Sequence, residues 1–247
     1  MHWSVFSSSD PRGQNKYFSI VKHLLHNPVY HALISGDRHL SFGEGNVKYF
    51  DEQVSPFAGF EHDYEKGFTD LYDIFSSGRR ILYAAPFQII QPAGWQLLHE
   101  IKGLQFVYEK GSEIKTEFSN IMPLEEIHVE QMMQLAKLTK PGPFGLRTID
   151  FGYYFGIFNN ENLLSMTGQR LHVQNFTEIS AVCTHPNHTG KGYAYTLLQH
   201  QLHLILQQED QQPFLHVRED NLRAIALYQR LGFRISRSMN FYFMKRQ

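Results

Sequence analysis

The sequence predicts a mixed α/β fold in which helices flank one central sheet. Two segments carry most of this prediction. Residues 176–184 have the pattern of an apolar strand, which runs through a turn rich in Gly, Pro and Asn into a helix over 190–208. Residues 213–218 form a second predicted strand, followed by a helix that starts near Asn221 and ends at Gly232. Strands and helices that alternate in this way are typical of a sheet covered by helices.

The elements around these two segments complete the predicted sheet. Apolar side chains at helical spacing predict a helix over 125–138, and a loop rich in Pro and Gly ends it. Two strands follow near 152–158 and 163–171, joined by an Asn-rich turn. A strand near 237–246 closes the domain, which we place at residues 121–247.

Residues 1–120 have a less regular pattern. The expected elements are a helix near 14–26, short strands near 31–50, a helix near 62–75, a strand at 80–84, a short helix at 93–100 and a strand at 104–109. This order roughly repeats that of the second half, but no Gly-x-Gly turn opens a helix here. We therefore expect residues 1–120 to form a degenerate copy of the second-half fold that lacks its ligand turn.

Composition narrows the function classes. The 247 residues carry a formal net charge of −1, so the broad positive patch expected of a nucleic-acid-binding protein is missing. No apolar run approaches the roughly 18 residues of a membrane span, and the N-terminus lacks the apolar segment of a signal peptide. The single cysteine, Cys183, excludes an intrachain disulfide and suits a reducing compartment. We expect a cytoplasmic protein with no nucleic-acid or membrane partner.

The turn between 184 and 193 is a predicted anion site. The first N–H groups of a helix have no intrahelical acceptor, and the helix dipole adds roughly half a positive charge there. Gly190 and Gly192 have no Cβ to keep a phosphate from the backbone. A P-loop is excluded because Gly192 stands where its hydroxyl residue must be, and a dinucleotide fingerprint is excluded because Tyr195 replaces its last glycine.

The remaining pattern resembles motif A of the GNAT superfamily of acyl-CoA-dependent N-acetyltransferases. The family has Gln/Arg-x-x-Gly-x-Gly/Ala at this turn, and Thr189, Gly192 and Ala194 occupy the three positions. Gly192 and Ala194 match. Thr189 departs from the pattern, which should weaken cofactor binding without abolishing it, because the backbone amides remain.

A second motif supports this resemblance. Asn221, Ala224, Tyr228, Gly232 and Phe233 fit the Asn-x-x-Ala-x-x-x-Tyr-x-x-x-Gly-Phe pattern of GNAT motif B at every named position. The stretches 177–186 and 213–217 further resemble the branch that contains glycine N-acyltransferase-like proteins. The resemblance is clear over about residues 124–247. It implies an acyl-CoA N-acyltransferase-like fold of two similar halves, of which only the C-terminal one carries the cofactor motifs.

The resemblance also implies the acyl donor and the residues that bind it. Acetyl-CoA would place its pantetheine arm where strand 179–184 separates from strand 213–218. The implied cofactor-binding residues are Val182, Thr184, Thr189, Gly190, Lys191, Gly192, Tyr193, Ala194 and Asn221. Lys191 either neutralises phosphate charge or is simply solvated. No His-Glu-x-x-His frame or comparable ligand set is present, so we expect no metal.

Acyl transfer from a thioester needs a deprotonated amine, a polarised carbonyl and a protonated or tolerated thiolate. The resemblance implies Tyr228 as the general acid for the thiolate, with packing against the sheet as the alternative reading. A main-chain N–H on strand 179–184 would polarise the carbonyl. Glu178 is either a base or substrate anchor, or half of a structural ion pair, because a carboxylate in an apolar strand needs a partner or a cleft. His216 is a further candidate base, or a satisfied core histidine.

The acceptor is less strongly indicated. A lysine amine costs roughly 4 kcal/mol to deprotonate near neutral pH and an α-amine under about 1, so a weak base favours an α-amine. Arg147 would clamp a substrate carboxylate, or it is a solvated loop residue. The sequence thus favours an N-acetyltransferase acting on a small amino-acid-like amine. A non-catalytic acyl-CoA sensor and an acetyltransferase of protein amines remain the alternatives.

Overall fold

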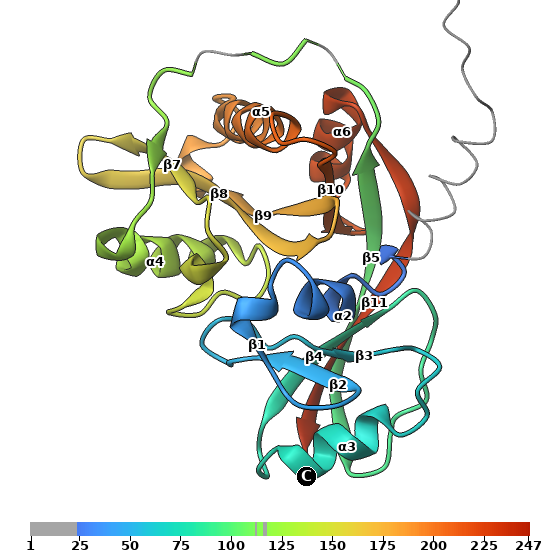
Figure 1. Cartoon of the computed structure of the whole chain (residues 1–247). Helices are drawn as coiled ribbons and strands as arrows, with labels where there is room; N and C mark the ends of the chain where they lie inside the picture. The colour runs from blue at the N-terminus through green and yellow to red at the C-terminus, as the bar shows by residue number, and fades with distance from the viewer. Residues whose placement is uncertain (1–23, 112, 116–117) are drawn as a thin grey trace, which may run out of the picture.

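A computed structural model describes residues 24–111, 113–115 and 118–247 of the chain (Figure 1). In chain order, with η marking 3-10 helices, its elements are α2 (Pro28–Ile34), η1 (Arg38–Leu40), β1 (Ser41–Phe42), β2 (Val47–Phe50), β3 (Ala58–Phe60), α3 (Gly67–Ile74), β4 (Arg80–Ala85), β5 (Trp95–Tyr108), β6 (Met122–Pro123), η2 (Glu126–His128), α4 (Val129–Thr139), η3 (Thr148–Phe151), β7 (Phe155–Asn159), β8 (Asn162–Val173), β9 (Phe176–Thr184), η4 (Pro186–His188), α5 (Tyr193–Leu206), β10 (Gln212–Arg218), α6 (Leu222–Leu231) and β11 (Phe233–Arg246).

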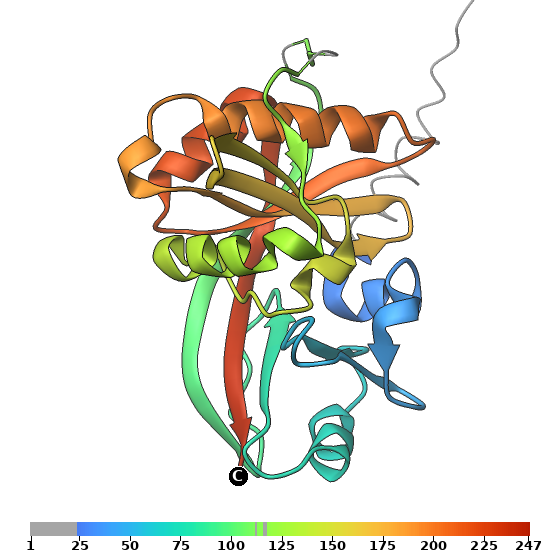
Figure 2. The same cartoon turned by 90° about the vertical axis from the view of Figure 1, so that its left-hand side faces the viewer.

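The predicted mixed sheet with flanking helices is confirmed. Eight strands form one sheet in the order β4-β11-β5-β10-β9-β8-β7-β6, and β1-β2-β3 form a smaller sheet. Within the large sheet β9 and β10 are parallel neighbours, because α5 carries the chain back across the sheet between them. Helices α5 and α6 cover one face of the sheet, and α4 and α2 lie on the other (Figures 1 and 2).

Burial explains why the predicted strands and helices of the second half form where they do. Most residues of β9 are buried, as expected of a strand covered by helices on both faces. In α5 the buried leucines 197, 198 and 202 and Ile205 recur at helical spacing and face the sheet. Helix α6 begins at Asn221, whose side-chain oxygen accepts a hydrogen bond from the Ala224 N–H at 3.2 Å. These contacts fix the two strand–helix units on one face.

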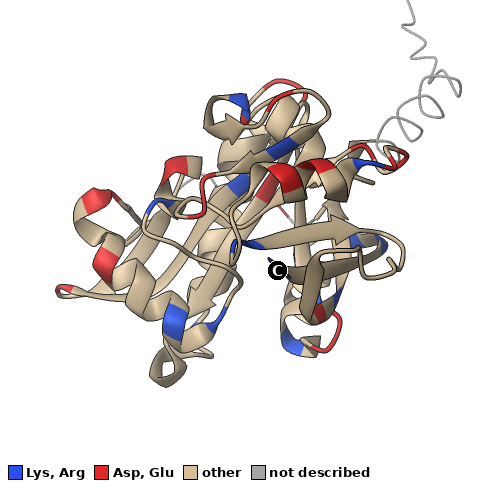
Figure 3. Ribbon diagram, turned by 90° about the horizontal axis from the view of Figure 1, so that it is seen from below, with Lys and Arg blue, Asp and Glu red and all other residues tan. Residues whose placement is uncertain are grey.

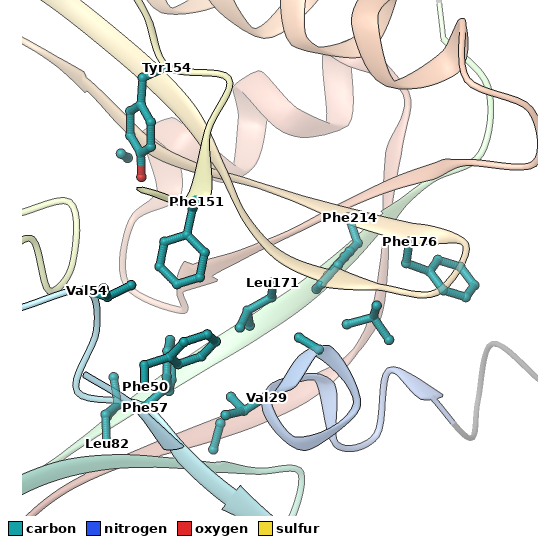
Figure 4. Packing of buried hydrophobic residues seen from close by; sticks show 14 of the residues in the cluster. Val29, Phe50, Val54, Phe57, Leu82, Phe151, Tyr154, Leu171, Phe176 and Phe214 are labelled. Carbon is teal, nitrogen blue, oxygen red and sulfur yellow. The ribbon is translucent and has the colours of Figure 1, made fainter. Parts of the chain in front are cut away.

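Two apolar clusters sandwich the centre of the sheet. One lies under α5 and α6 and includes Leu198, Leu202 and Tyr228. The other fills the opposite face between the sheet, α2, α4 and the first-half strands, with Phe50, Phe57, Phe176 and Phe214 among its buried rings (Figure 4). The sheet is therefore packed from both sides at the position of β9.

The first half departs from prediction at two places. Residues 31–34, expected in a strand, belong to helix α2, which begins with Pro28 at its first position. Residues 95–100, expected in a short helix, are the start of strand β5, which pairs with β11 from Trp95 to Tyr108. This long cross-strand pairing overrides the local helical pattern. The helix predicted over 14–26 lies almost wholly outside the described residues, while the helix near 62–75 and the strand at 80–84 are confirmed.

Strands from both halves of the chain share the large sheet. Strand β5 lies between β10 and β11, and β4 pairs with the far edge of β11. The division at residue 120 into two similar halves stays a prediction. Among the described residues, no helix has the length and apolarity needed to cross a membrane. Lys and Arg are interspersed with Asp and Glu in the view from below (Figure 3).

Gly232 ends α6 with a φ of 103°, and an added Cβ would lie 2.5 Å from Gly111 Cα. We expect Gly232→Ala to lower the free energy of unfolding by more than about 1 kcal/mol, because the steric clash adds to the backbone strain. Gly45→Ala is the control, since its φ is 57° but nothing lies within 4 Å of the added Cβ. Urea unfolding checks both variants, and equal losses would contradict a role for the contact with Gly111.

Candidate functional site

Strands β9 and β10 pair over only part of their length. Their parallel ladder runs from Phe176↔Gln212 to Glu178↔Phe214 and then stops, although β9 continues to Thr184 and β10 to Arg218. Beyond this point β9 pairs only with β8, and β10 only with β5. The facing backbone edges of 179–184 and 215–218 therefore have no strand partner and are open to a ligand that hydrogen-bonds like a strand.

A bulge distorts β9 within this segment, in its ladder with β8. Ser180 pairs with Gly168 and Cys183 with Met166, so Ala181 and Val182 both oppose one residue of β8. Ala181 has a φ of 53°, which is uncommon for a residue with a side chain. Such bulges re-aim backbone and side-chain groups and are enriched next to active sites.

The turn between β9 and α5 presents free backbone donors. The N–H groups of residues 190–195 have no hydrogen-bond acceptor among the described residues. Gly190 and Gly192 have φ values of 82° and 83°, which favour glycine, and nothing lies within 4 Å of a Cβ added at either position. Gly192 is also the N-cap of α5 and leaves the start of that helix without a side-chain cap. The turn has the free donors and the open space that an anion needs.

Some of the predicted cofactor-binding side chains already have partners. The Thr189 hydroxyl donates to the Pro186 carbonyl at 3.2 Å, and Lys191 Nζ lies 3.4 Å from His188 Nδ1. The Thr184 hydroxyl is 2.8 Å from Ser165 Oγ. Val182 packs partly buried against the α5–α6 cluster, and Tyr193 and Ala194 form the first turn of α5. Asn221 uses its side-chain oxygen to cap α6, so only its amide nitrogen remains for a ligand.

Tyr228 projects from α6 into the cluster beneath it. Its side chain is 6% exposed, and its ring centroid lies 6.2 Å from those of Phe106 and Phe233. The hydroxyl has no hydrogen-bond partner among the described residues. Burial raises the pKa of Tyr228, and the nearby Cys183 adds to the rise, so the phenol is protonated at neutral pH.

Glu178 is held in a buried ion pair. Its carboxylate accepts two hydrogen bonds from Arg170, both at 2.8 Å, and lies 2.7 Å from His216 Nδ1. The side chain is 1% exposed. Burial alone would raise the pKa of Glu178, but the charge and hydrogen bonds of Arg170 outweigh it and lower the pKa to about 2. A carboxylate with this pKa and these partners has the properties of the structural ion pair.

The ion pair belongs to a longer side-chain network. His216 Nε2 lies 3.1 Å from Gln105 Nε2, and Gln105 donates to the Leu25 carbonyl at 2.8 Å. Arg170, Glu178, His216 and Gln105 come from the adjacent strands β8, β9, β10 and β5. The contact between Glu178 and His216 joins β9 to β10 at the point where their backbone pairing ends.

Arg147 lies apart from this network. The guanidinium of Arg147 pairs with Asp150 at 2.8 Å, and the backbone N–H of Arg147 donates to the Gln53 carbonyl at 3.0 Å. About half of its side chain is exposed, as expected of the solvated-loop alternative. The described residues contain no group of three or more His, Cys, Asp or Glu side chains that could hold a metal ion. A cavity of about 390 Å³ lies between α4, the start of β8 and His185, and none of the predicted site residues lines it.

Comparisons with known proteins agree with this geometry. The family model of FR47-like proteins matches residues 154–242, which contain the split strands, the turn and Tyr228. The chain is similar to a GNAT-family protein from Novosphingobium aromaticivorans, with 27% identity and a TM-score of 0.83 over 91% of this chain and 99% of that one. The chain has the acyl-CoA N-acyltransferase fold of the GNAT acetyltransferases and is an acyltransferase.

Two further structures share the fold with the acyltransferase. A Drosophila protein has 14% identity and a TM-score of 0.63, over 96% of this chain and 97% of its own. A GNAT-family acetyltransferase from Colwellia psychrerythraea has 12% identity and a TM-score of 0.50, over 98% and 99%. A search of curated proteins finds no match. The expected likeness to the glycine N-acyltransferase-like branch stays a prediction.

The sequence did not reveal two residues of the acyltransferase's network, Arg170 and Gln105. A signal for Arg170 was present, because a cation inside the apolar strand 163–171 needs a buried partner just as Glu178 does. What the sequence lacks is the register that sets Arg170 opposite Glu178. Gln105 carries no comparable signal, because the sequence predicts its strand but not the strands that pair with it.

Glu178→Gln should destabilise the acyltransferase by about 3–5 kcal/mol, because it leaves the buried Arg170 without its charged partner. Arg218→Ala breaks an exposed pair with Asp220 and should cost at most about 1 kcal/mol. Urea unfolding at pH 7 measures both. Similar losses in the two variants would contradict the structural role of Glu178.

The lowered pKa of Glu178 predicts that the free energy of unfolding depends on pH. Its folded pKa of about 2 lies below the ordinary value of 4.5, so its contribution is fully present above pH 4.5. This contribution is lost as the pH falls from 4.5 towards 2, and unfolding free energies measured over this range should decline more steeply for the parent protein than for Glu178→Gln. Parallel curves of unfolding free energy against pH for the two proteins would show that Glu178 has the same pKa in the folded and unfolded states.

Proposed function

We propose that the acyltransferase transfers the acetyl group of acetyl-CoA to a primary amine of a small amino-acid-like molecule by direct attack. The observation that carries this proposal is the row of free N–H groups at residues 190–195, next to the unpaired edges of β9 and β10. These features fit a ligand with a diphosphate at one end and an amide-bearing arm at the other, which is the chemistry of coenzyme A.

The phosphate end fits the turn for two reasons. Free N–H groups at the start of the 14-residue helix α5 favour negative charge. The open space above Gly190 and Gly192 allows phosphate oxygens to reach the backbone. The arm would then lie along β9 beside Val182 and Thr184, and the bulge at Ala181 would turn a main-chain N–H towards the thioester carbonyl.

Tyr228 is proposed as the general acid. In the reaction the amine nitrogen bonds to the carbonyl carbon, the carbon–sulfur bond breaks, and the sulfur leaves with the bonding electrons. Tyr228 gives its proton to that sulfur and regains one from solvent, while the amine loses one proton. A protonated phenol without a hydrogen-bond partner is suited to this step. The base is not assigned, because Glu178 is committed to Arg170.

The alternative functions, the cellular setting and the origin of residues 1–120 are also proposals. Thr189 favours a non-catalytic acyl-CoA sensor as the second candidate, because it replaces the longer polar side chain, Arg or Gln, that the family has there, and its hydroxyl donates to the Pro186 carbonyl. Acetylation of protein amines is the third. We also propose a cytoplasmic setting, and that residues 1–120 derive from a copy of the same fold that lost the ligand turn.

Gly192→Ala should weaken binding of coenzyme A about tenfold or more. The added Cβ strains a backbone with a φ of 83° and occupies the space proposed for phosphate. Isothermal titration calorimetry with coenzyme A measures the change, and Gly45→Ala, which also has a positive φ but lies outside the site, is the control. If the parent protein does not bind coenzyme A, the proposed function is wrong.

Tyr228→Phe should lower kcat for acetyl transfer about a hundredfold, within the range for loss of a general acid, and leave coenzyme A binding unchanged. Release of free thiol from acetyl-CoA, in the presence of a panel of amino acids, polyamines and peptides, gives the rate. A parent protein that binds coenzyme A but acetylates none of these amines would favour the sensor. An undiminished rate in the variant would remove the acid role and keep the enzyme.

A further inference from the structure

We propose that the cavity between α4 and the start of β8 is a separate binding site for an uncharged purine, as the free base or as its nucleoside. The cavity measures about 390 Å³, which is the usual size of a small-molecule site. None of its lining comes from β10, α5 or α6. Helix α4 lies on the sheet face opposite α5 and α6, so the inference goes beyond the proposed function (Figures 1 and 2).

Four segments of the chain meet at this cavity. Helix α4 supplies one wall through side chains three and four residues apart, which share one helical face. The turn between β7 and β8 supplies two asparagines, and the first residues of β8 supply two leucines. His185 and His188, at the two ends of η4, complete the lining. Most of the walls belong to helices and strands, so the cavity exists before a ligand binds.

The lining of the cavity carries no Lys, Arg, Asp or Glu side chain. It consists of glutamine, asparagine, histidine and leucine residues. Partial desolvation lowers the pKa of His188, and the nearby Lys191 and His185 add to the fall, so this imidazole is neutral at pH 7. A phosphate, a carboxylate or an ammonium group would meet no opposite charge in the lining. We therefore expect the ligand to be uncharged.

Hydrogen bonds within the protein orient the two amides of α4. Gln131 Oε1 accepts a hydrogen bond from the Leu163 N–H at 2.9 Å, which leaves the amide nitrogen of Gln131 as a donor. Gln134 donates from its amide nitrogen to Glu130 at 3.4 Å, which leaves its oxygen as an acceptor. The two glutamines are three residues apart and therefore neighbours on the helix. Together they present a donor beside an acceptor to the cavity.

The two imidazoles are oriented in the same way. His185 Nδ1 accepts a hydrogen bond from the Asn187 N–H at 3.2 Å, and Lys191 Nζ lies 3.4 Å from His188 Nδ1 and donates to it. A neutral imidazole that accepts at Nδ1 carries its proton on Nε2. The two rings lie edge-on, with centroids 5.6 Å apart. Each ring therefore offers one further donor and an aromatic face to a ligand.

A flat heterocycle with donors and acceptors along its edge matches these groups. Glutamine and asparagine amides pair with the donor–acceptor edge of adenine, and histidine rings stack on bases. Leu135 and Leu138 of α4 provide apolar surface for the face of such a ring. Sugars lack an aromatic face, and amino acids and polyamines carry charges that the lining does not match. An adenine-like purine is the class that uses both the amides and the leucines.

Calorimetry of the full-length protein with adenosine, purine riboside and D-ribose tests the ligand class. We expect adenosine to bind, purine riboside, which lacks the exocyclic amine, to bind about tenfold more weakly, and D-ribose not to bind. Adenosine should bind equally well with saturating coenzyme A present. Absence of adenosine binding, or equal affinities for the two nucleosides, would overturn the inference. Displacement of adenosine by coenzyme A would also overturn it, because the protein would then have one adenine site, and would leave the proposed function intact.

Leu138→Trp tests whether adenosine binds in this cavity. Leu138 lines the cavity near the end of α4 and is 53% exposed, so an indole there should fill part of the cavity without disturbing the core. We expect adenosine binding to weaken about tenfold or more, with coenzyme A binding and the melting temperature unchanged. Leu206→Trp, at the end of α5 in a leucine that is 40% exposed, is the matched control. An unchanged adenosine affinity in Leu138→Trp would overturn the inference.

Gln134→Leu tests the hydrogen bonds to the purine edge. Gln134 is exposed, so its replacement should leave the fold intact. If its oxygen accepts from the exocyclic amine, the variant should bind adenosine and purine riboside with nearly equal affinity, whereas the parent protein prefers adenosine. Gln207→Leu, at the exposed C-cap of α5, is the control and should keep the preference. A preference in Gln134→Leu as large as in the parent protein would overturn recognition of the purine edge by α4.

Discussion

A buried chain of polar side chains determines where the sheet of this acyltransferase opens. Arg170, Glu178, His216 and Gln105 cross four neighbouring strands. Glu178, in the last pair of the backbone ladder between β9 and β10, contacts His216 and ties the two strands together where the ladder ends. Strands that diverge without such a tie would lose register further down, because nothing but apolar packing would hold them. The open edges used by the proposed cofactor site begin at this tie.

Tyr228 and Tyr154 lie on opposite faces of the sheet beside β9. Tyr228 approaches from the helix-covered face and Tyr154 from the face covered by α2, α4 and their loops. Both are buried, and neither hydroxyl has a partner among the described residues. Burial raises the pKa of both phenols, so both are protonated at neutral pH.

Local patterns in the sequence predicted the second half of the fold closely. Strand β9 has the predicted bounds, Asn221 caps α6, and Gly232 ends it with a positive φ, since each of these depends on neighbouring residues in the chain. The first half was harder because β5 is defined by pairing with strands more than a hundred residues away, and residues 95–100 alone resemble a helix. The Glu178 partner was missed for the same reason: Arg170 opposite it depends on register, which no local pattern encodes.

The position of β5 has a consequence for how the two halves depend on each other. It is contributed by the first half, yet it lies between β10 and β11 of the second and hydrogen-bonds to both. A polypeptide that began at residue 121 would expose the inner edges of both strands and leave His216 without Gln105. Neither half is a self-sufficient folding unit in this arrangement. The site residues of the second half therefore depend on a strand that the first half supplies.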